Sequence, residues 1–240
     1  MLKIVSLLSV LLLLISCDKE IKDMNYKPNT NNIINKSIYF GHQSVGNNIL
    51  DGIKDINIPE LNIHDFYIGE NRNPISKIKH FENFIFNELK EGNQIDVATM
   101  KLCFVDITSE TNIKGIFLEY VLMINRLKKD YPNLNIVHIT VPLTNENLSL
   151  STRIKRIIKS VLGKPTYDRK ANFTRNKYNN FLRKEFPNET IFDLAKLESR
   201  GYNEYGSPAL VLDFSDDGGH LNVVGRRNIA KKFIEFLNNI

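Results

Sequence analysis

The chain has 240 residues, of which 42% are hydrophobic and 25% charged, and it carries a formal net charge of +5. A chain of this length suits one folded domain with a full hydrophobic core. No cluster of arginines interleaved with aromatic residues accompanies the positive charge. We therefore interpret the charge as solvated surface and expect no nucleic-acid partner.

Residues 1–16 have the pattern of a secretory signal peptide. Lys3 precedes an apolar run over residues 4–15, which is too short for a comfortable transmembrane helix. The ending Leu-Ile-Ser-Cys17 resembles the bacterial lipobox, which implies lipidation of Cys17. We expect a lipoprotein of the bacterial cell envelope, tethered to its membrane rather than spanning it. Inner and outer membrane both stay open, and so does a plain secreted or membrane-anchored protein.

The elements that follow alternate in type along the chain. Residues 17–36 are polar and rich in asparagine, and we expect a tether there. From residue 37 to residue 240, short apolar runs alternate with longer amphipathic segments, which indicates a parallel sheet with helices on both faces. The expected strands are residues 37–41, 61–67, 96–105, 134–141 and 190–192; the expected helices are residues 45–53, 113–127 and 167–186, one that opens at Asn73-Pro74, and a last one near the C-terminus.

Ser44, directly after the first predicted strand, is the first candidate for chemistry. Gly41 and Gly46 bracket this turn and permit a close backbone approach or a positive φ. A helix that starts here would direct backbone N–H groups at a negatively charged oxygen formed nearby. Two interpretations stay open: Ser44 is a nucleophile activated by a base, or its hydroxyl caps the helix at residues 45–53.

Asp217 and His220 form the second candidate segment, directly before the last helix. Their spacing of three residues, in a turn with two glycines, lets a carboxylate reach the imidazole Nδ1–H. That contact leaves Nε2 free to accept a proton from a serine. In the alternative interpretation Asp217 caps the last helix and His220 is incidental. Asp216 competes for the orienting role, and we prefer Asp217 on spacing.

These motifs resemble those of the SGNH (GDSL-like) hydrolases: a glycine-flanked serine after the first strand, and Asp217-x-x-His220-x-Asn222 before the last helix. Strand and helix order fit over residues 37–240, and Gly-His-Gln-Ser is similar to the Gly-Gln-Ser-Asn start of carbohydrate acetylesterases in that superfamily. The resemblance implies a three-layer, flavodoxin-like α/β/α domain with a five-stranded parallel sheet. It also implies ester hydrolysis without metal or cofactor, with Ser44 as nucleophile, His220 as base and Asp217 as its orienter.

The chain departs from that family at the oxyanion site. SGNH enzymes usually carry Gly-x-Asn-Asp after the third strand, and the asparagine donates to the oxyanion; here Val105 stands in its place, before Asp106. Loss of one such donor costs about 10²–10³ in rate in other hydrolases. Each candidate replacement has an ordinary structural alternative. The candidates for the oxyanion or the substrate are Gly69, Asn71 with Asn73 nearby, Lys101 and His42.

A metal centre is the alternative chemistry. His42, Cys103, Asp106, Asp217 and His220 could converge on one face, but no spacing such as Cys-x-x-Cys or His-Glu-x-x-His supports a metal site. Removal of residues 1–16 and lipidation of Cys17 would leave Cys103 as the remaining thiol, so we also expect no internal disulfide.

The sequence thus favours a lipid-anchored serine esterase that removes acyl groups, such as acetyl, from an extracytoplasmic carbohydrate. The alternative is a carbohydrate-binding lipoprotein on the same fold that has lost turnover together with its oxyanion asparagine. The predicted organisation is a signal peptide at residues 1–16, a tether at residues 17–36 and an SGNH hydrolase-like domain at residues 37–240.

Overall fold

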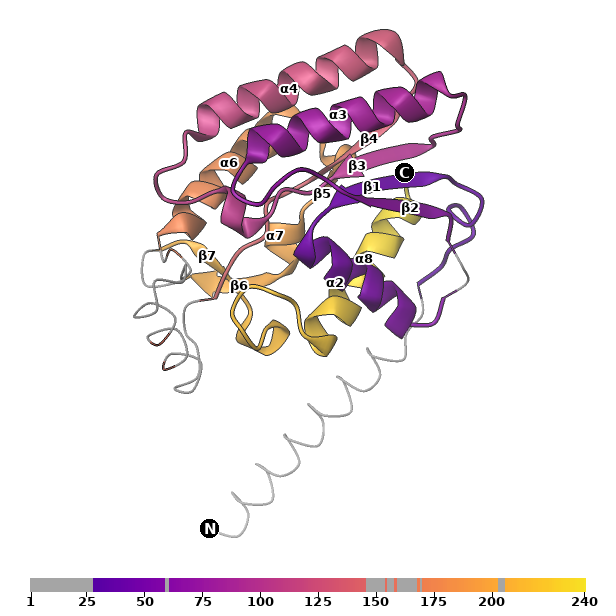
Figure 1. Ribbon diagram of the computed structural model, residues 1–240. Helices are drawn as coiled ribbons and strands as arrows, with labels where there is room; N and C mark the ends of the chain where they lie inside the picture. Colours follow the sequence, from indigo (N-terminus) through magenta and orange to yellow (C-terminus); the bar gives the residue numbers. More distant parts are fainter. Residues whose placement is uncertain are drawn as a thin grey trace.

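A computed structural model describes residues 28–58, 61–145, 154, 158, 168, 170–202 and 206–240. The predicted signal peptide and Cys17 lie outside these residues. Within them, five strands form an all-parallel sheet in the order β2-β1-β3-β4-β5, which confirms the predicted flavodoxin-like arrangement (Figure 1). The strands are β1 (Ile38–His42), β2 (Ile63–Tyr67), β3 (Val97–Met100), β4 (Asn135–Ile139) and β5 (Ile191–Phe192).

Helices cover both faces of the sheet and make the predicted three-layer α/β/α domain (Figure 1). Helices α2 and α8 bury one face around Phe40 and Phe233, and helices α3, α4 and α6 bury the other around Phe81 and Met123. None of the described helices is long and apolar enough to cross a membrane. The helices are α2 (Ser44–Asp55), α3 (Pro74–Lys90), α4 (Ile113–Asp130), α6 (Ala171–Glu185), α7 (Leu194–Leu197) and α8 (Val223–Asn238).

Asparagine side chains begin three of these helices. Asn73, Asn112 and Asn222 each accept a hydrogen bond from a backbone N–H in the first turn of α3, α4 and α8. Such a bond satisfies one of the N–H groups that a helix start leaves without a partner. Asn73-Pro74 therefore opens α3 as the sequence predicts.

The third strand is shorter than the sequence predicts. The predicted strand spans residues 96–105, but β3 ends at Met100 and the chain turns into a short 3₁₀ helix, Phe104–Asp106. The carboxylate of Asp106 causes this turn, because it accepts the backbone N–H groups of Cys103 and Arg72 and draws the chain out of the ladder.

Two further differences concern segments without a strong apolar pattern. A two-stranded antiparallel hairpin, β6 (Ser199–Tyr202) with β7 (Pro208–Leu210), was not predicted; its strands are short and contain glycine or proline. Residues 28–36, assigned to the tether, pack on the domain instead. Ile33 is fully buried in the core beneath α8, and the Asn32 side chain and backbone both bond to Asn238. The folded domain therefore begins before residue 37.

Candidate active site

Ser44 is the first residue of α2 and follows β1 after a single intervening residue, Gln43. Gln43 is the N-cap, and its side-chain amide donates to the carbonyls of Ile68 and Gly69 at 2.9 and 3.0 Å. Ser44 is half-buried, and no described residue makes a hydrogen bond to its hydroxyl. Because Gln43 is the N-cap, the interpretation of Ser44 as a helix cap is wrong, and its hydroxyl has no bond to a described residue at the carboxyl end of β1.

The Asp217 carboxylate makes three hydrogen bonds within the loop that carries His220. One carboxylate oxygen lies 2.7 Å from His220 Nδ1, and the other accepts the backbone N–H groups of Gly219 and His220 at 2.8 Å each. Burial opposes ionisation, but these hydrogen bonds outweigh it and hold the pKa of Asp217 below its usual range. An ionised Asp217 fixes the proton on Nδ1, which leaves Nε2 as the acceptor.

The alternative roles for this segment do not match the structure. Asn222, not Asp217, caps α8, and its side chain also donates to Asp216 at 3.1 Å. Asp216 thus faces Asn222, and Asp217 is the carboxylate on the imidazole.

The histidine loop lies beside α2. The backbone N–H of Leu221 donates to the Asn48 side chain at 3.0 Å, and the Phe104 ring meets the His220 ring edge-on at 5.4 Å. Asn48 is four residues after Ser44 and therefore on the same face of α2. The loop that carries Asp217 and His220 therefore contacts α2 about one helical turn after Ser44, although these residues lie far apart in the sequence.

Comparison with solved structures decides the fold type. A Streptococcus pneumonia protein provisionally named a platelet activating factor aligns over 96% of this chain and 98% of its own, at 16% identity and a TM-score of 0.55. A provisionally named GDSL-like lipase from Parabacteroides merdae aligns over 89% and 100%, at 16% identity and a TM-score of 0.50. The chain has the SGNH/GDSL-like fold. No protein-family profile and no curated protein sequence matches it.

Two of the four predicted oxyanion or substrate residues of this SGNH-like domain are buried. His42 is fully buried beneath the first turn of α2, where its Nε2 lies 3.3 Å from Asp65 and its ring lies against Gly46. Burial lowers the pKa of His42, so its ring is a neutral support for the turn. Lys101 is also fully buried, and its ammonium donates to the Leu102 carbonyl at 3.3 Å. Neither side chain is exposed for contact with a substrate, so the structure does not support these two candidates.

Gly69 is excluded by its hydrogen bond. Its backbone N–H donates to Nδ1 of His80 at 3.1 Å, so it is not available to an oxyanion. Its φ of +42° instead serves the turn after β2, where a side chain would collide with the backbone of Lys77 at 2.8 Å. Gly69 is therefore a turn residue of the SGNH-like fold here.

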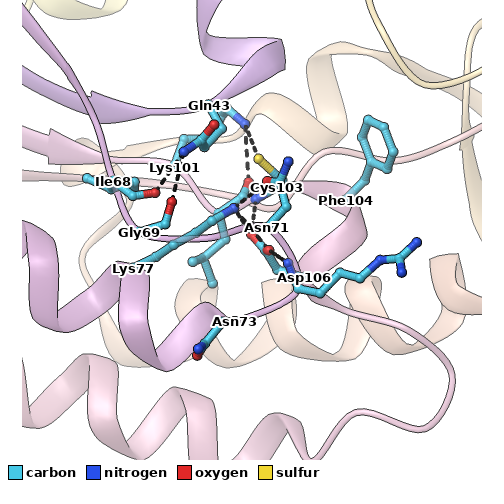
Figure 2. Close-up of polar contacts among 12 residues, drawn as sticks. Gln43, Ile68, Gly69, Asn71, Asn73, Lys77, Lys101, Cys103, Phe104 and Asp106 are labelled. Atoms are coloured by element: carbon cyan, nitrogen blue, oxygen red, sulfur yellow. Dashed lines mark hydrogen bonds and ion pairs between the residues drawn. The ribbon is translucent and has the colours of Figure 1, made fainter.

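Asn71 is the remaining candidate, and a buried ion pair orients it (Figure 2). Its side-chain oxygen accepts from Lys77 Nζ at 2.9 Å, so the amide NH₂ group is the end left for a substrate. Lys77 and Asp106 have side chains with no exposed area, and Lys77 Nζ lies 2.7 and 3.0 Å from the two Asp106 oxygens. Figure 2 shows how Lys77 and Asp106 connect Asn71 to Cys103, which lies in the loop that carries the replaced asparagine position.

Lys77 is the site residue that sequence reasoning missed. It lies among the apolar residues of α3, next to the buried Ile78, and its fully buried side chain cannot be told from a solvated lysine by pattern alone. The one available signal is Asp106, since a carboxylate within an apolar run needs a partner of opposite charge.

Among the described residues, no group of three or more histidine, cysteine, aspartate or glutamate side chains is arranged to hold a metal ion. The histidines considered for such a site are each engaged with a carboxylate, His42 with Asp65 and His220 with Asp217.

Proposed function

We propose that this protein is a serine ester hydrolase of SGNH type. The observation that carries the proposal is the 2.7 Å contact between Asp217 and His220 in a loop bonded to α2, the helix that begins at Ser44. A serine hydrolase needs a nucleophile, a base and an acid that orients the base, and Ser44, His220 and Asp217 would take these roles in that order.

The reaction would run in two balanced steps. Ser44 Oγ attacks the ester carbonyl carbon while its proton passes to His220 Nε2, and the leaving alcohol takes that proton as the ester bond breaks. The acyl group is then held on Ser44. Water attacks this acyl group with His220 again as base, and the carboxylic acid leaves as the Ser44 hydroxyl is restored.

Asn71 would supply the oxyanion contact that Val105 cannot. An amide NH₂ is the donor type used at such sites, and Lys77 fixes which end of the Asn71 amide faces out. The backbone N–H groups at the start of α2 add a second donor, since the first N–H groups of a helix have no partner within it.

The substrate and location that we propose are those indicated by the sequence: acyl groups, acetyl among them, on an extracytoplasmic carbohydrate, and a lipid anchor at Cys17 in the bacterial cell envelope. The lipobox-like residues and the acetylesterase-like Gly-His-Gln-Ser segment support this assignment. The second candidate is a carbohydrate-binding protein of the same fold with little or no turnover, which the replacement of the oxyanion asparagine by Val105 favours.

Hydrolysis of p-nitrophenyl acetate by the protein separates these functions. Ser44→Ala should abolish the enzymatic rate. Ser76→Ala is a matched control, because Ser76 is also half-buried and in the first turn of a helix. Equal rates for wild type and Ser44→Ala would support the binding protein instead.

A further inference from the structure

Helix α6 carries a buried arginine near its start. Arg175 is 2% exposed, and its Nε donates to the carbonyls of Phe104 and Ile107 at 2.9 and 3.1 Å. Its Nη1 donates to Thr144 Oγ1 and Asn172 Oδ1 at 2.9 and 2.8 Å. A buried guanidinium is costly unless its N–H groups have partners, so these bonds favour one arrangement of the segments that carry the acceptors. Arg175 therefore ties the loops that follow β3 and β4 to α6.

Phe104 connects Arg175 to His220. The guanidinium Cζ lies 5.8 Å from the centre of the Phe104 ring, and that ring meets the His220 ring edge-on at 5.4 Å. Phe104 is buried, whereas the His220 side chain is 42% exposed, so the Phe104 ring covers the inner side of the imidazole. A displacement of Phe104 would therefore reach His220 directly.

The loop after β4 gives a second connection. Thr144 is bonded to Asn172 on both sides: its N–H donates to Oδ1 at 3.0 Å, and its carbonyl accepts from Nδ2 at 2.7 Å. The backbone N–H of the next residue, Asn145, donates to the Gly218 carbonyl at 2.8 Å. Gly218 lies two residues before His220 and has a φ of +84°, a conformation that glycine adopts without strain. The network around Arg175 thus also holds the turn that carries His220.

A second contact on His220 matters because Asp217 fixes only one atom of its ring. A hydrogen bond at Nδ1 leaves the ring plane able to rock about that bond, and Nε2 lies on the far side of the ring. A general base must lie about 2.6–3.2 Å from the hydroxyl whose proton it takes. Packing of the imidazole against Phe104 limits this motion and therefore limits where Nε2 can lie.

We propose that Arg175 is a positioning residue for His220. It acts through the Phe104 ring and through the hydrogen bond to Gly218, and it sets the orientation in which Nε2 takes up the serine proton. The proposal rests on the proposed function, because it needs His220 to act as the base. Arg175 itself is buried and does not touch the substrate.

Arg175→Lys tests this proposal in the active protein. The variant keeps the charge, but one ammonium group cannot span the acceptors that the planar guanidinium joins. For p-nitrophenyl acetate, kcat should fall about 100-fold with KM nearly unchanged, the loss expected when a catalytic group is displaced by about 1 Å. Arg183→Lys is the matched control, because Arg183 lies eight residues later on α6 and makes two hydrogen bonds to Asp193, at 2.8 and 2.7 Å. The control should keep its kcat even where its thermal midpoint falls as far.

NMR of the imidazole gives a readout that a merely structural role would not move. The carbon-bound protons of the His220 ring lie next to the Phe104 ring, and their signals are identified among those of the five histidines by their absence in His220→Ala. Phe104→Leu removes the aromatic ring and defines the chemical shift without it. The signals in Arg175→Lys should move toward the Phe104→Leu position, and those in Arg183→Lys should stay at the wild-type position.

Phe104→Leu also tests the proposal where Arg175→Lys does not fold, since it keeps the carbonyl that accepts from Arg175. Its kcat should fall with KM nearly unchanged, and a wild-type kcat would overturn the proposal. In a protein with Ser44-dependent hydrolysis, a wild-type kcat in Arg175→Lys, or a loss of kcat with the His220 signals unmoved, would also overturn it and leave the proposed function standing. Wild-type protein without Ser44-dependent hydrolysis would refute the proposed function itself, and with it a role for Arg175 in proton transfer.

Discussion

Two sides of the proposed site are built in opposite ways. On one side, the Asp217–His220 pair has side chains 50% and 42% exposed and is held by a turn of glycines and backbone N–H groups. On the other side, Lys77 and Asp106 are ion-paired with no exposed area, and exposed Asn71 bonds to Lys77. In the proposed mechanism His220 takes up and releases a proton, which its exposed position permits. The proposed oxyanion donor has only to stay fixed, and a buried ion pair can hold it in place.

Replacement of His220, on the exposed side of the site, should have the largest effect on the rate of hydrolysis. His220→Ala should lower kcat by about 10⁴-fold or more, because the serine then has no base and the acid has nothing to orient. Hydrolysis of p-nitrophenyl acetate measures the loss. His64→Ala is the matched control: His64 is exposed and stacks on Tyr39, away from Ser44, and should keep nearly the whole rate. Equal losses in the two variants would place the chemistry elsewhere.

Replacement of Lys77 tests whether the buried ion pair with Asp106 contributes to the free energy of unfolding. Lys77→Met should lower the free energy of unfolding by about 3–5 kcal/mol, because it leaves the Asp106 carboxylate buried without its partner. Urea denaturation measures the change. Lys77→Met with Asp106→Asn should recover part of the stability, since an amide carries no charge, although its one oxygen can accept from Arg72 or from Cys103 but not from both. No recovery would mean that the ion pair is not the stabilising element.

Asn71 is the exposed end of this buried network and the proposed oxyanion donor. Asn71→Ala should reduce kcat by about 10²–10³ with little change in KM, the loss that follows removal of one oxyanion donor. Asn71→Asp should lose as much, because it keeps an oxygen for Lys77 but has no NH₂ group. Asn73→Ala should instead cost about 1 kcal/mol of stability through its lost helix cap and leave kcat unchanged. An unchanged kcat in Asn71→Ala would remove this residue from the mechanism.

The smallest effect concerns acid stability. The folded-state pKa of Asp217 lies below its unfolded value of 3.8, so its contribution is complete above that pH and is lost as pH falls through the folded pKa. Wild type should therefore be more stable than Asp217→Asn at pH 5, and their thermal midpoints should converge below pH 4. Solvent screening keeps the difference small because the carboxylate is half exposed. A constant gap across this range would contradict the assigned pairing.

The fold was largely predictable because its strands are short apolar runs separated by clear helix starts. The failures have local causes. Asp106 ends β3 early by accepting backbone N–H groups, and no apolar pattern reports that. Ile33 lies in an asparagine-rich stretch that reads as a tether, yet its single side chain is fully buried and brings the stretch onto the domain.

The contact between Asp217 and His220 could be predicted because it depends only on their spacing in the sequence. A spacing of three positions from Asp217 to His220 suffices to bring carboxylate and imidazole together. Spacing could not show which of the oxyanion candidates are exposed at the site, because that depends on burial and on partners far away in the sequence. His42 and Lys101 are enclosed by the tertiary fold, and Asn71 depends on Lys77, six residues later, whose burial follows from Asp106 in another loop.

Covalent capture tests the central claim most directly. The protein is treated with a fluorophosphonate, digested, and the modified peptide is identified by mass spectrometry, beside Ser44→Ala and Ser76→Ala. The proposed mechanism predicts one adduct, on Ser44, that is lost in Ser44→Ala, retained in Ser76→Ala and strongly slowed by His220→Ala. An unlabelled Ser44 in folded protein, or a label of equal rate on another serine, would contradict it.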